Sequence, residues 1–192
     1  LELDKLKINI DFIDMGGGLG VNYMGEETSQ PFELIQIYEK IFDGRNETLV
    51  LEPGRSISAN AGIILAKVEY KKDNFIITDT AMNDLLRPAL YDAHHDVWPV
   101  VKNENPTSNF NVVGPICETG DFLAKDIDIA ASENDLLAIR TVGAYGSVMS
   151  SNYNSRPRAA EVLVDKKNFY LIRKREDHST LTSLEEGLDD QI

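Results

Sequence analysis

The stretch Thr48-Leu-Val-Leu-Glu-Pro-Gly-Arg55 decides the fold of the amino-terminal part of this chain. Its apolar half is typical of a buried strand, and its polar half places the carboxylate of Glu52 and the guanidinium of Arg55 around a Pro-Gly turn. A charged loop directly after a buried strand is a common position for a ligand site. By itself, the loop is equally compatible with a surface turn that holds a local ion pair.

A second expected strand, residues 8–13, ends upstream in Asp14-Met-Gly16-Gly17-Gly18-Leu-Gly20. Three adjacent glycines leave backbone N–H groups bare for an anion, although a glycine loop alone can be only a permissive turn. Between the strands, residues 31–42 carry a broad apolar face, which predicts a helix. The resulting βαβ unit belongs to a parallel sheet, where both loops lie at the carboxyl ends of strands. We therefore expect both loops to face one phosphorylated ligand.

Charge and composition limit the partners of the 192-residue chain. A formal net charge of −13 and a pI of about 4.6 argue against nucleic acid or an anionic membrane, so we expect a small-molecule ligand. No apolar run approaches the roughly twenty residues of a membrane span, and no signal peptide is recognised. The single cysteine, Cys117, excludes an intrachain disulfide, and we infer a reduced, cytoplasmic compartment. The start at Leu1, without Met, indicates a piece of a longer protein.

The pattern changes near Gly62. Residues 1–61 are α/β, whereas the rest consists of short β-rich runs without a long amphipathic helix, which predicts a sandwich or small barrel. We expect two domains, 1–61 and 62–192, and an acidic, solvated tail with a frayed helix around 181–188. The β-rich runs are residues 62–70, 74–78, 98–101, 110–113, 135–140, 159–164 and 168–173.

Reactive side chains gather in three loops of the second domain. Residues 79–95 hold more polar groups than a connection needs, namely Asn83, Arg87, Tyr91, His94 and His95. Adjacent histidines point to different sides and lack a third ligand at metal spacing, so we expect hydrogen-bonded, partly buried imidazoles and no metal.

The other two loops contain the only thiol and a tyrosine between small residues. Buried cysteine is commonly inert, but Cys117 lies on a turn beside Glu118, which favours a thiol that exchanges a proton and a carboxylate that binds an ammonium. Tyr145, in Val142-Gly-Ala-Tyr-Gly146, is placed either to reach a ligand or to pack at a strand edge.

Five ordered motifs together resemble the diaminopimelate decarboxylase family. It lies within the alanine-racemase-like, pyridoxal-phosphate-dependent decarboxylases, which include ornithine and arginine decarboxylases. The resemblance covers about residues 10–173 and implies the carboxyl-terminal part of a phosphate-binding (β/α)8 barrel, followed by a β-sandwich or β-barrel domain. The motifs are Gly16-Gly17-Gly18, Glu52-Pro53-Gly54-Arg55, Asn83…Arg87-Pro88…Tyr91-Asp92, Gly114-Pro115-Ile116-Cys117-Glu118-Thr119-Gly120-Asp121 and Gly143-Ala144-Tyr145-Gly146.

For the cofactor, pyridoxal 5'-phosphate, the resemblance implies contacts from three motifs. Gly16, Gly17 and Gly18 bind the phosphate, helped by the N-terminus of the following element. Glu52 faces the pyridine nitrogen and keeps it protonated, which strengthens the ring as an electron sink. The cofactor-binding set is Gly16, Gly17, Gly18, Glu52, Pro53, Gly54, Arg55 and Tyr145.

For the substrate, the resemblance implies that Arg87 and Tyr91 clamp the distal, non-reacting end of diaminopimelate. Glu118 takes the distal ammonium and Cys117 is the proton donor, the single catalytic residue of this set. Arg55 holds a carboxylate, and Tyr145 also touches the ligand. The Cys-Glu loop enters the active site of the other subunit, so a complete site needs a homodimer.

The expected reaction is the decarboxylation of meso-2,6-diaminopimelate to L-lysine and CO2, the last step of lysine biosynthesis. Ornithine decarboxylases typically carry Cys-Asp at Cys117-Glu118, so a related decarboxylase of a polyamine precursor is the first alternative. Thr80, in place of a small Gly or Ala, is a minor departure from the family pattern.

The lysine that forms the Schiff base has no counterpart here, since Lys5, Lys7 and Lys40 lie at the wrong elements. We therefore expect the chain alone to be inactive. The missing lysine is the only support for a second alternative, a non-catalytic homologue or interaction module.

Overall fold

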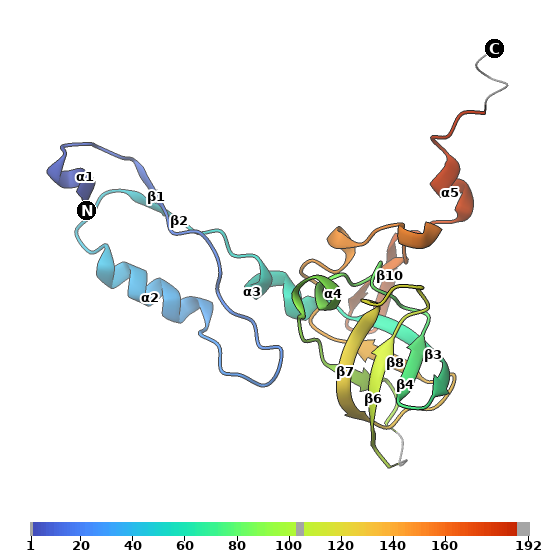
Figure 1. Cartoon of the computed structure of the whole chain (residues 1–192). Helices are drawn as coiled ribbons and strands as arrows, with labels where there is room; N and C mark the ends of the chain where they lie inside the picture. The colour runs from blue at the N-terminus through green and yellow to red at the C-terminus, as the bar shows by residue number, and fades with distance from the viewer. Residues whose placement is uncertain (1, 103–105, 188–192) are drawn as a thin grey trace.

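A computed structural model describes residues 2–102 and 106–187 of the chain. Figure 1 shows a small α/β unit at the amino-terminal end and a β-sheet at the other. Two short helical turns, α3 (Arg55–Ser58) and η1 (Ala59–Ala61), connect them.

The amino-terminal unit is the predicted βαβ arrangement. Strands β1 (Phe12–Asp14) and β2 (Thr48–Val50) pair in parallel, with Phe12 opposite Thr48 and Asp14 opposite Val50. Between them lies α2 (Pro31–Ile41), whose first turn is stabilised by a hydrogen bond from the Gln30 backbone N–H to the Glu33 carboxylate at 2.9 Å. A short helix, α1 (Glu2–Lys5), precedes β1.

Two details of this unit differ from expectation. The strand at residues 8–13 is shorter and begins only at Phe12. An irregular segment, residues 15–30, separates the glycine loop from α2, so the helix N-terminus does not directly follow the glycines. The predicted helix is confirmed at Pro31–Ile41. Its apolar face, however, is not covered by other described residues of this chain, since no helix residue is buried and Phe32, Ile35 and Ile41 are exposed.

A six-stranded mixed sheet forms the second part, with the strand order β5-β8-β3-β4-β6-β7. Only β4 and β6 pair in parallel, and the edge strands β5 and β7 approach each other, so the sheet is nearly closed into a small barrel. Its strands are β3 (Ile64–Lys72), β4 (Phe75–Thr78), β5 (Val97–Pro99), β6 (Ser108–Val113), β7 (Phe122–Ile129) and β8 (Leu136–Ile139).

The core of the sheet comes from the inward-facing side of each strand. Ala66 and Val68 alternate with outward residues along β3, as a half-buried strand requires. Strand β7 was not predicted from the sequence. A bulge at Asp126, whose φ is 52°, and the charges around it interrupt its alternation. The fully buried apolar residues of this core are Ala66, Val68, Ile76, Leu85, Val112, Leu137 and Ile139.

The carboxyl-terminal segment adds a separate two-stranded antiparallel sheet, β9 (Glu161–Asp165) with β10 (Asn168–Arg173). Helix α5 (His178–Thr182) begins with the Asp177 carboxylate accepting a hydrogen bond from the Thr180 backbone N–H at 2.8 Å. The helix expected around 181–188 therefore begins and ends earlier, and residue 188 lies outside the described residues. Short 3-10 turns, η2 (Ser147–Met149) and η3 (Tyr153–Ser155), precede the hairpin, and α4 (Arg87–Tyr91) follows β4.

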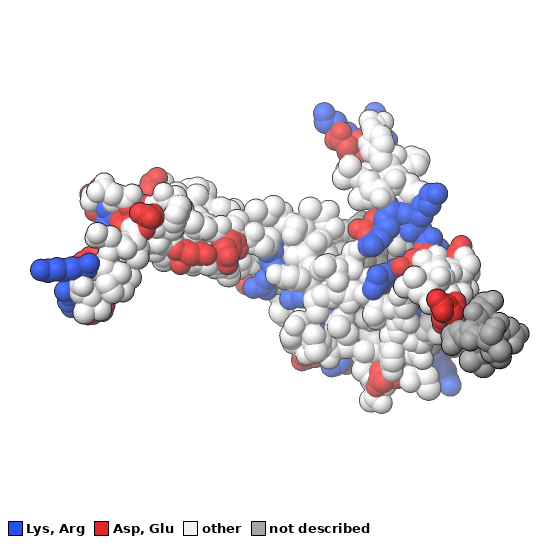
Figure 2. All heavy atoms as spheres, turned by 90° about the horizontal axis from the view of Figure 1, so that it is seen from above, with Lys and Arg blue, Asp and Glu red and all other residues white. Residues whose placement is uncertain are grey.

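Charged side chains are mixed over the face in Figure 2, where Lys and Arg lie in separate groups among acidic and uncharged residues. In the described part of the chain, no helix is long and apolar enough to cross a membrane.

Candidate functional site

The glycine loop and the Glu-Pro-Gly-Arg loop lie against each other at the ends of β1 and β2. The Met15 N–H donates to the Val50 carbonyl at 3.0 Å, and the Glu52 N–H donates to the Gly16 carbonyl at 2.8 Å, so the strand pairing extends into both loops. A side chain at Gly17 would place its Cβ 2.2 Å from the Glu52 carbonyl oxygen, which no residue other than glycine allows. The predicted meeting of these two loops is confirmed.

The loop containing Tyr145 reaches the same region from the sheet. A Cβ at Gly54 would lie 3.6 Å from the Tyr145 hydroxyl, so the phenol lies directly beside the Pro-Gly turn. Tyr145 is 46% exposed and has a φ of 66°, which is uncommon for a residue with a side chain. Its loop is fixed by a hydrogen bond from the Gly143 N–H to the Ala59 carbonyl at 3.0 Å. Tyr145 thus lies partly exposed beside the Glu-Pro-Gly-Arg loop, and its contact with a ligand stays a prediction.

Arg87 begins α4 and points toward the segment that follows the glycine loop. Its Nη1 donates to the Tyr23 hydroxyl at 3.1 Å and to His95 Nε2 at 3.0 Å. The guanidinium also lies 5.1 Å from the centre of the Tyr23 ring, within range of a cation–π interaction. Sequence reasoning had not identified Tyr23 as a functional residue.

The two adjacent histidines have different environments, as expected. His95 is buried and accepts from Arg87, whereas His94 is partly exposed and pairs with Asp96 Oδ1 at 3.1 Å. Among the described residues, no group of three or more His, Cys, Asp or Glu side chains is placed to hold a metal ion.

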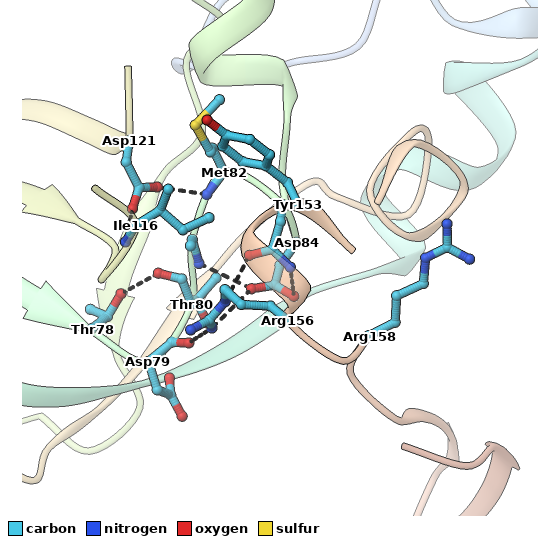
Figure 3. A network of polar contacts seen from close by, with 12 residues as sticks. Thr78, Asp79, Thr80, Met82, Asp84, Ile116, Asp121, Tyr153, Arg156 and Arg158 are labelled. Carbon is cyan, nitrogen blue, oxygen red and sulfur yellow. Dashed lines mark hydrogen bonds and ion pairs between the residues drawn. The ribbon is translucent and has the colours of Figure 1, made fainter. Parts of the chain in front are cut away.

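Asp121 holds the segment that leads into the Cys117-Glu118 turn, and Figure 3 shows its carboxylate facing Met82 and Ile116. Asp121 is 4% exposed, and its two carboxylate oxygens accept from the backbone N–H groups of Met82 at 2.7 Å and Ile116 at 2.8 Å. Burial raises the pKa of the Asp121 carboxyl, and these two hydrogen bonds oppose the rise. The turn that carries Cys117 is therefore braced against the loop that leads to Arg87.

Cys117 is a free, exposed thiol on a turn between β6 and β7, as the flanking Gly-Pro and Thr-Gly indicate. Glu118 beside it accepts a hydrogen bond from the Tyr153 hydroxyl at 3.2 Å, and this bond raises the pKa of Tyr153. No hydrogen bond or ion pair between described residues connects Cys117 or Glu118 to Glu52, Arg55 or Tyr145.

Arg156 fixes the loop that precedes α4. Arg156 Nε donates to Asn83 Oδ1 at 2.9 Å, and its Nη2 lies 3.7 Å from Asp84 Oδ2 (Figure 3). The Asn83 amide in turn donates to the Ser151 carbonyl at 3.3 Å. Asn83, which the sequence singled out as a surplus polar group, is thus part of a structural network.

Gly16 is held within its own loop, because its N–H donates to Asp14 Oδ1 at 2.7 Å, so this N–H is not bare as the sequence predicted. The structure also places the other predicted site residues. Arg55 starts α3, and Tyr91 ends α4 with 64% of its surface exposed. Gly16 and Gly18 have positive φ values of 68° and 87°, and a Cβ on either would meet no atom within 4 Å. Their open surroundings and the adjacent Glu52 carboxylate fit a phosphorylated cofactor with a basic ring nitrogen.

A glycine loop and a carboxylate at the ends of parallel strands, next to a small β-barrel, are typical of enzymes that bind a phosphorylated cofactor. Residues 11–143 match the model of the family described as "Pyridoxal-dependent decarboxylase, C-terminal sheet domain". The chain belongs to this family of pyridoxal-dependent decarboxylases.

Within this family, the chain is similar to diaminopimelate decarboxylases of several bacteria. The chain is 49% identical to diaminopimelate decarboxylase of Vibrio cholerae over 194 residues, which cover 97% of this chain and 46% of that protein. It is 54% identical to diaminopimelate decarboxylase of Pseudomonas aeruginosa over 173 residues, covering 88% of this chain and 42% of that protein. The chain spans about half the length of the curated relatives it matches.

A solved structure agrees with this comparison. The crystal structure of diaminopimelate decarboxylase from Helicobacter pylori complexed with L-lysine superposes with a TM-score of 0.89 at 41% identity. The match covers 100% of this chain and 48% of that one.

Proposed function

We propose that this chain is the carboxyl-terminal half of a diaminopimelate decarboxylase, which converts meso-2,6-diaminopimelate to L-lysine and CO2. The observation that carries the proposal is the glycine loop packed against Glu52, with a Cβ at Gly17 placed 2.2 Å from the Glu52 carbonyl oxygen. The identity to diaminopimelate decarboxylases supports the choice of substrate. Residues 1–61 then complete a (β/α)8 barrel with a preceding half, and residues 62–192 are the β-domain.

When bound, pyridoxal 5'-phosphate supplies the electron sink for the loss of CO2. The residues that would hold it are the backbone N–H groups of Gly17 and Gly18 for the phosphate, Glu52 for the ring nitrogen, and Gly54, Arg55 and Tyr145 around them. The Gly16 N–H donates to Asp14 Oδ1 at 2.7 Å, so Gly16 contributes the open backbone of the loop. Glu52 keeps a proton on the ring nitrogen because its carboxylate balances the positive charge. Pro53 fixes the turn that sets the distance between Glu52 and Arg55.

The substrate residues act on the two ends of an elongated diamino diacid. Arg55 and Arg87 are guanidinium groups suited to carboxylates, and Glu118 is suited to the distal ammonium. Tyr91 and Tyr145 orient the ligand, and Cys117 delivers the proton that replaces CO2. The exposed apolar face of α2 supports a barrel partner from the preceding half, since large apolar surfaces are normally covered.

The assignment is tested by the substrate range of the complete enzyme loaded with pyridoxal phosphate. We expect CO2 release from meso-diaminopimelate, with kcat/KM for ornithine, arginine and L-lysine lower by about 100-fold or more, because unmatched charges remain desolvated in the site. Efficient release from ornithine would instead establish the decarboxylase of a polyamine precursor. Absence of both cofactor binding and CO2 release would establish a non-catalytic homologue.

The active site of the complete enzyme is proposed to be shared between two subunits of a cytoplasmic homodimer. This arrangement is supported by the absence, among the described residues, of any hydrogen bond or ion pair that joins Cys117 or Glu118 to the loops around Glu52. Glu118 is instead paired with Tyr153 of its own chain at 3.2 Å, on an exposed turn suited to reach a neighbour.

Subunit mixing measures this sharing. Glu118→Ala and a substitution of the Schiff-base lysine of the preceding half should each abolish most activity, since a desolvated charged contact is worth about 2 to 5 kcal/mol. Equimolar mixing should restore up to about a quarter of the wild-type activity, because each hybrid dimer regains one intact site. If subunit exchange is demonstrated by mass spectrometry and activity stays at the level of the separate variants, each site is built from one chain.

A further inference from the structure

Arg87 is held by two acceptors on a single guanidinium nitrogen. Nη1 donates to Tyr23 Oη at 3.1 Å and to His95 Nε2 at 3.0 Å. An Nη group carries two hydrogens, so these two bonds use both of them. Arg87 is only 8% exposed and His95 only 1%, so the pair lies within the protein and solvent does not compete for these hydrogens.

The protonation of His95 follows from its two partners. Its Nδ1 lies 2.9 Å from the Arg140 carbonyl oxygen, which only accepts, so Nδ1 carries the hydrogen. Its Nε2 faces Arg87 Nη1, which only donates, so Nε2 presents a lone pair. Burial, together with the positive charge of Arg87, lowers the pKa of His95, which keeps the imidazole neutral in agreement with both contacts.

His95 and Tyr23, the two acceptors of Arg87 Nη1, are held in place by the fold. His95 leads into β5, and the β5–β8 pairing continues past the strands through a hydrogen bond from the Arg140 N–H to the Asp96 carbonyl at 2.9 Å. The Tyr23 ring packs edge-on against the His95 ring, with centroids 5.4 Å apart and an interplanar angle of 82°. The three side chains therefore form one unit that joins the glycine-loop segment, α4 and the sheet.

This unit leaves one edge of the guanidinium available. Within residues 2–102 and 106–187, Arg87 Nε and Nη2 form no hydrogen bond, and neither is a fully buried atom without a partner. Nε and Nη2 are the two parallel donors that bind a carboxylate bidentately. Because Nη1 is already hydrogen-bonded, a ligand carboxylate can bind Arg87 only along the Nε–Nη2 edge. This fixes the orientation of that carboxylate relative to the guanidinium.

We propose that His95 and Tyr23 are positioning residues that set the specificity for a carboxylate at the non-reacting end of the substrate, by engaging Arg87 Nη1 and presenting the Nε–Nη2 edge. This inference rests on the proposed function. It assigns to a neutral histidine and a tyrosine a role that acts through Arg87 and involves no contact with the reacting atoms.

The experiment compares two ligands that differ by one carboxylate, L-lysine and cadaverine, on the complete enzyme loaded with pyridoxal phosphate. His95→Met replaces the imidazole acceptor at similar size by a thioether, which accepts only weakly. We expect this variant to raise the dissociation constant for L-lysine about tenfold or more, as for the loss of a hydrogen bond to a charged group. The constant for cadaverine should change less than about twofold, because that ligand has no carboxylate for Arg87. In steady state, KM for diaminopimelate should rise while kcat changes little.

Three further variants distinguish positioning from packing. His95→Gln, which restores an acceptor, should recover most of the affinity for L-lysine, and Tyr23→Phe should lower the preference for L-lysine over cadaverine with its ring still packed. His94→Met, at the partly exposed neighbouring histidine, should match the wild type.

The proposal would be overturned if the His95 variants bound L-lysine and cadaverine more weakly by the same factor. It would also be overturned if Tyr23→Phe left the ratio of the two dissociation constants unchanged, a result that stands even if His95→Met failed to fold. A wild-type enzyme that neither prefers L-lysine to cadaverine nor decarboxylates diaminopimelate would instead remove the proposed function.

Discussion

Glu52→Gln in the complete enzyme is expected to lower kcat by about 100- to 1000-fold, the usual cost of removing one preorganised electrostatic group. A neutral amide cannot balance a positive charge on the ring nitrogen of the cofactor. The ring then withdraws electrons less strongly at the stage where the substrate loses CO2. Single-turnover CO2 release, normalised to bound pyridoxal phosphate, is the measurement.

The affinity for the cofactor should fall far less in this variant, by no more than about tenfold, because the phosphate contacts of the glycine loop remain. Glu133→Gln, at an exposed turn between β7 and β8, is the matched control and should behave as the wild type. If cofactor binding collapsed while turnover per bound cofactor stayed unchanged, Glu52 would be a structural residue of the loop.

The meeting of the two loops follows from sequence because parallel strands place their carboxyl ends at one edge. The apolar runs at residues 8–13 and 48–51 and the helical period between them were sufficient to predict this unit. The contact was then fixed by backbone geometry, since the Glu52 N–H donates to the Gly16 carbonyl at 2.8 Å.

Sequence reasoning failed where a bulge or a distant contact decides the structure. Strand β7 lacks a continuous alternation, because Asp126 takes a φ of 52° and shifts the register against β6. Tyr23 and Arg87 are 64 residues apart, and nothing in either local pattern indicates that they pair. His95 was expected to be a hydrogen-bonded, partly buried imidazole, but its bond to Arg87 depends on how β5 pairs with β8.

The same distinction applies to the Cys117-Glu118 turn. That Cys117 lies on a turn was predicted from the flanking Gly-Pro and Thr-Gly, which are local signals, and the structure shows the thiol exposed there. The brace by Asp121 joins this turn to the Met82 backbone, 39 residues away in the sequence, and required the fold. Local turn chemistry is therefore readable in this chain, whereas the contacts that position its reactive groups are set by the sheet.

Gly17→Ala is expected to weaken binding of pyridoxal phosphate to the complete enzyme by about 100-fold, the scale of losing a hydrogen bond to a charged phosphate. The added Cβ would lie 2.2 Å from the Glu52 carbonyl oxygen and 3.2 Å from its carbonyl carbon. Because the obstacle is backbone, the two loops must separate, and this lengthens the 2.8 Å bond from the Glu52 N–H to the Gly16 carbonyl. Cofactor titration followed by absorbance is the measurement.

Gly20→Ala is the matched control for Gly17→Ala, since it lies in the same loop and changes the same atoms. Its Cβ would meet only Thr28 Cγ2 at 3.5 Å, an ordinary van der Waals contact, and its φ is not in the left-handed region. We expect cofactor affinity within about threefold of the wild type for this variant, because neither backbone must move. Circular dichroism of both variants verifies that the β-domain stays folded. Cofactor binding by Gly17→Ala that equals that of Gly20→Ala would show that the close approach of the two loops does not shape the phosphate site.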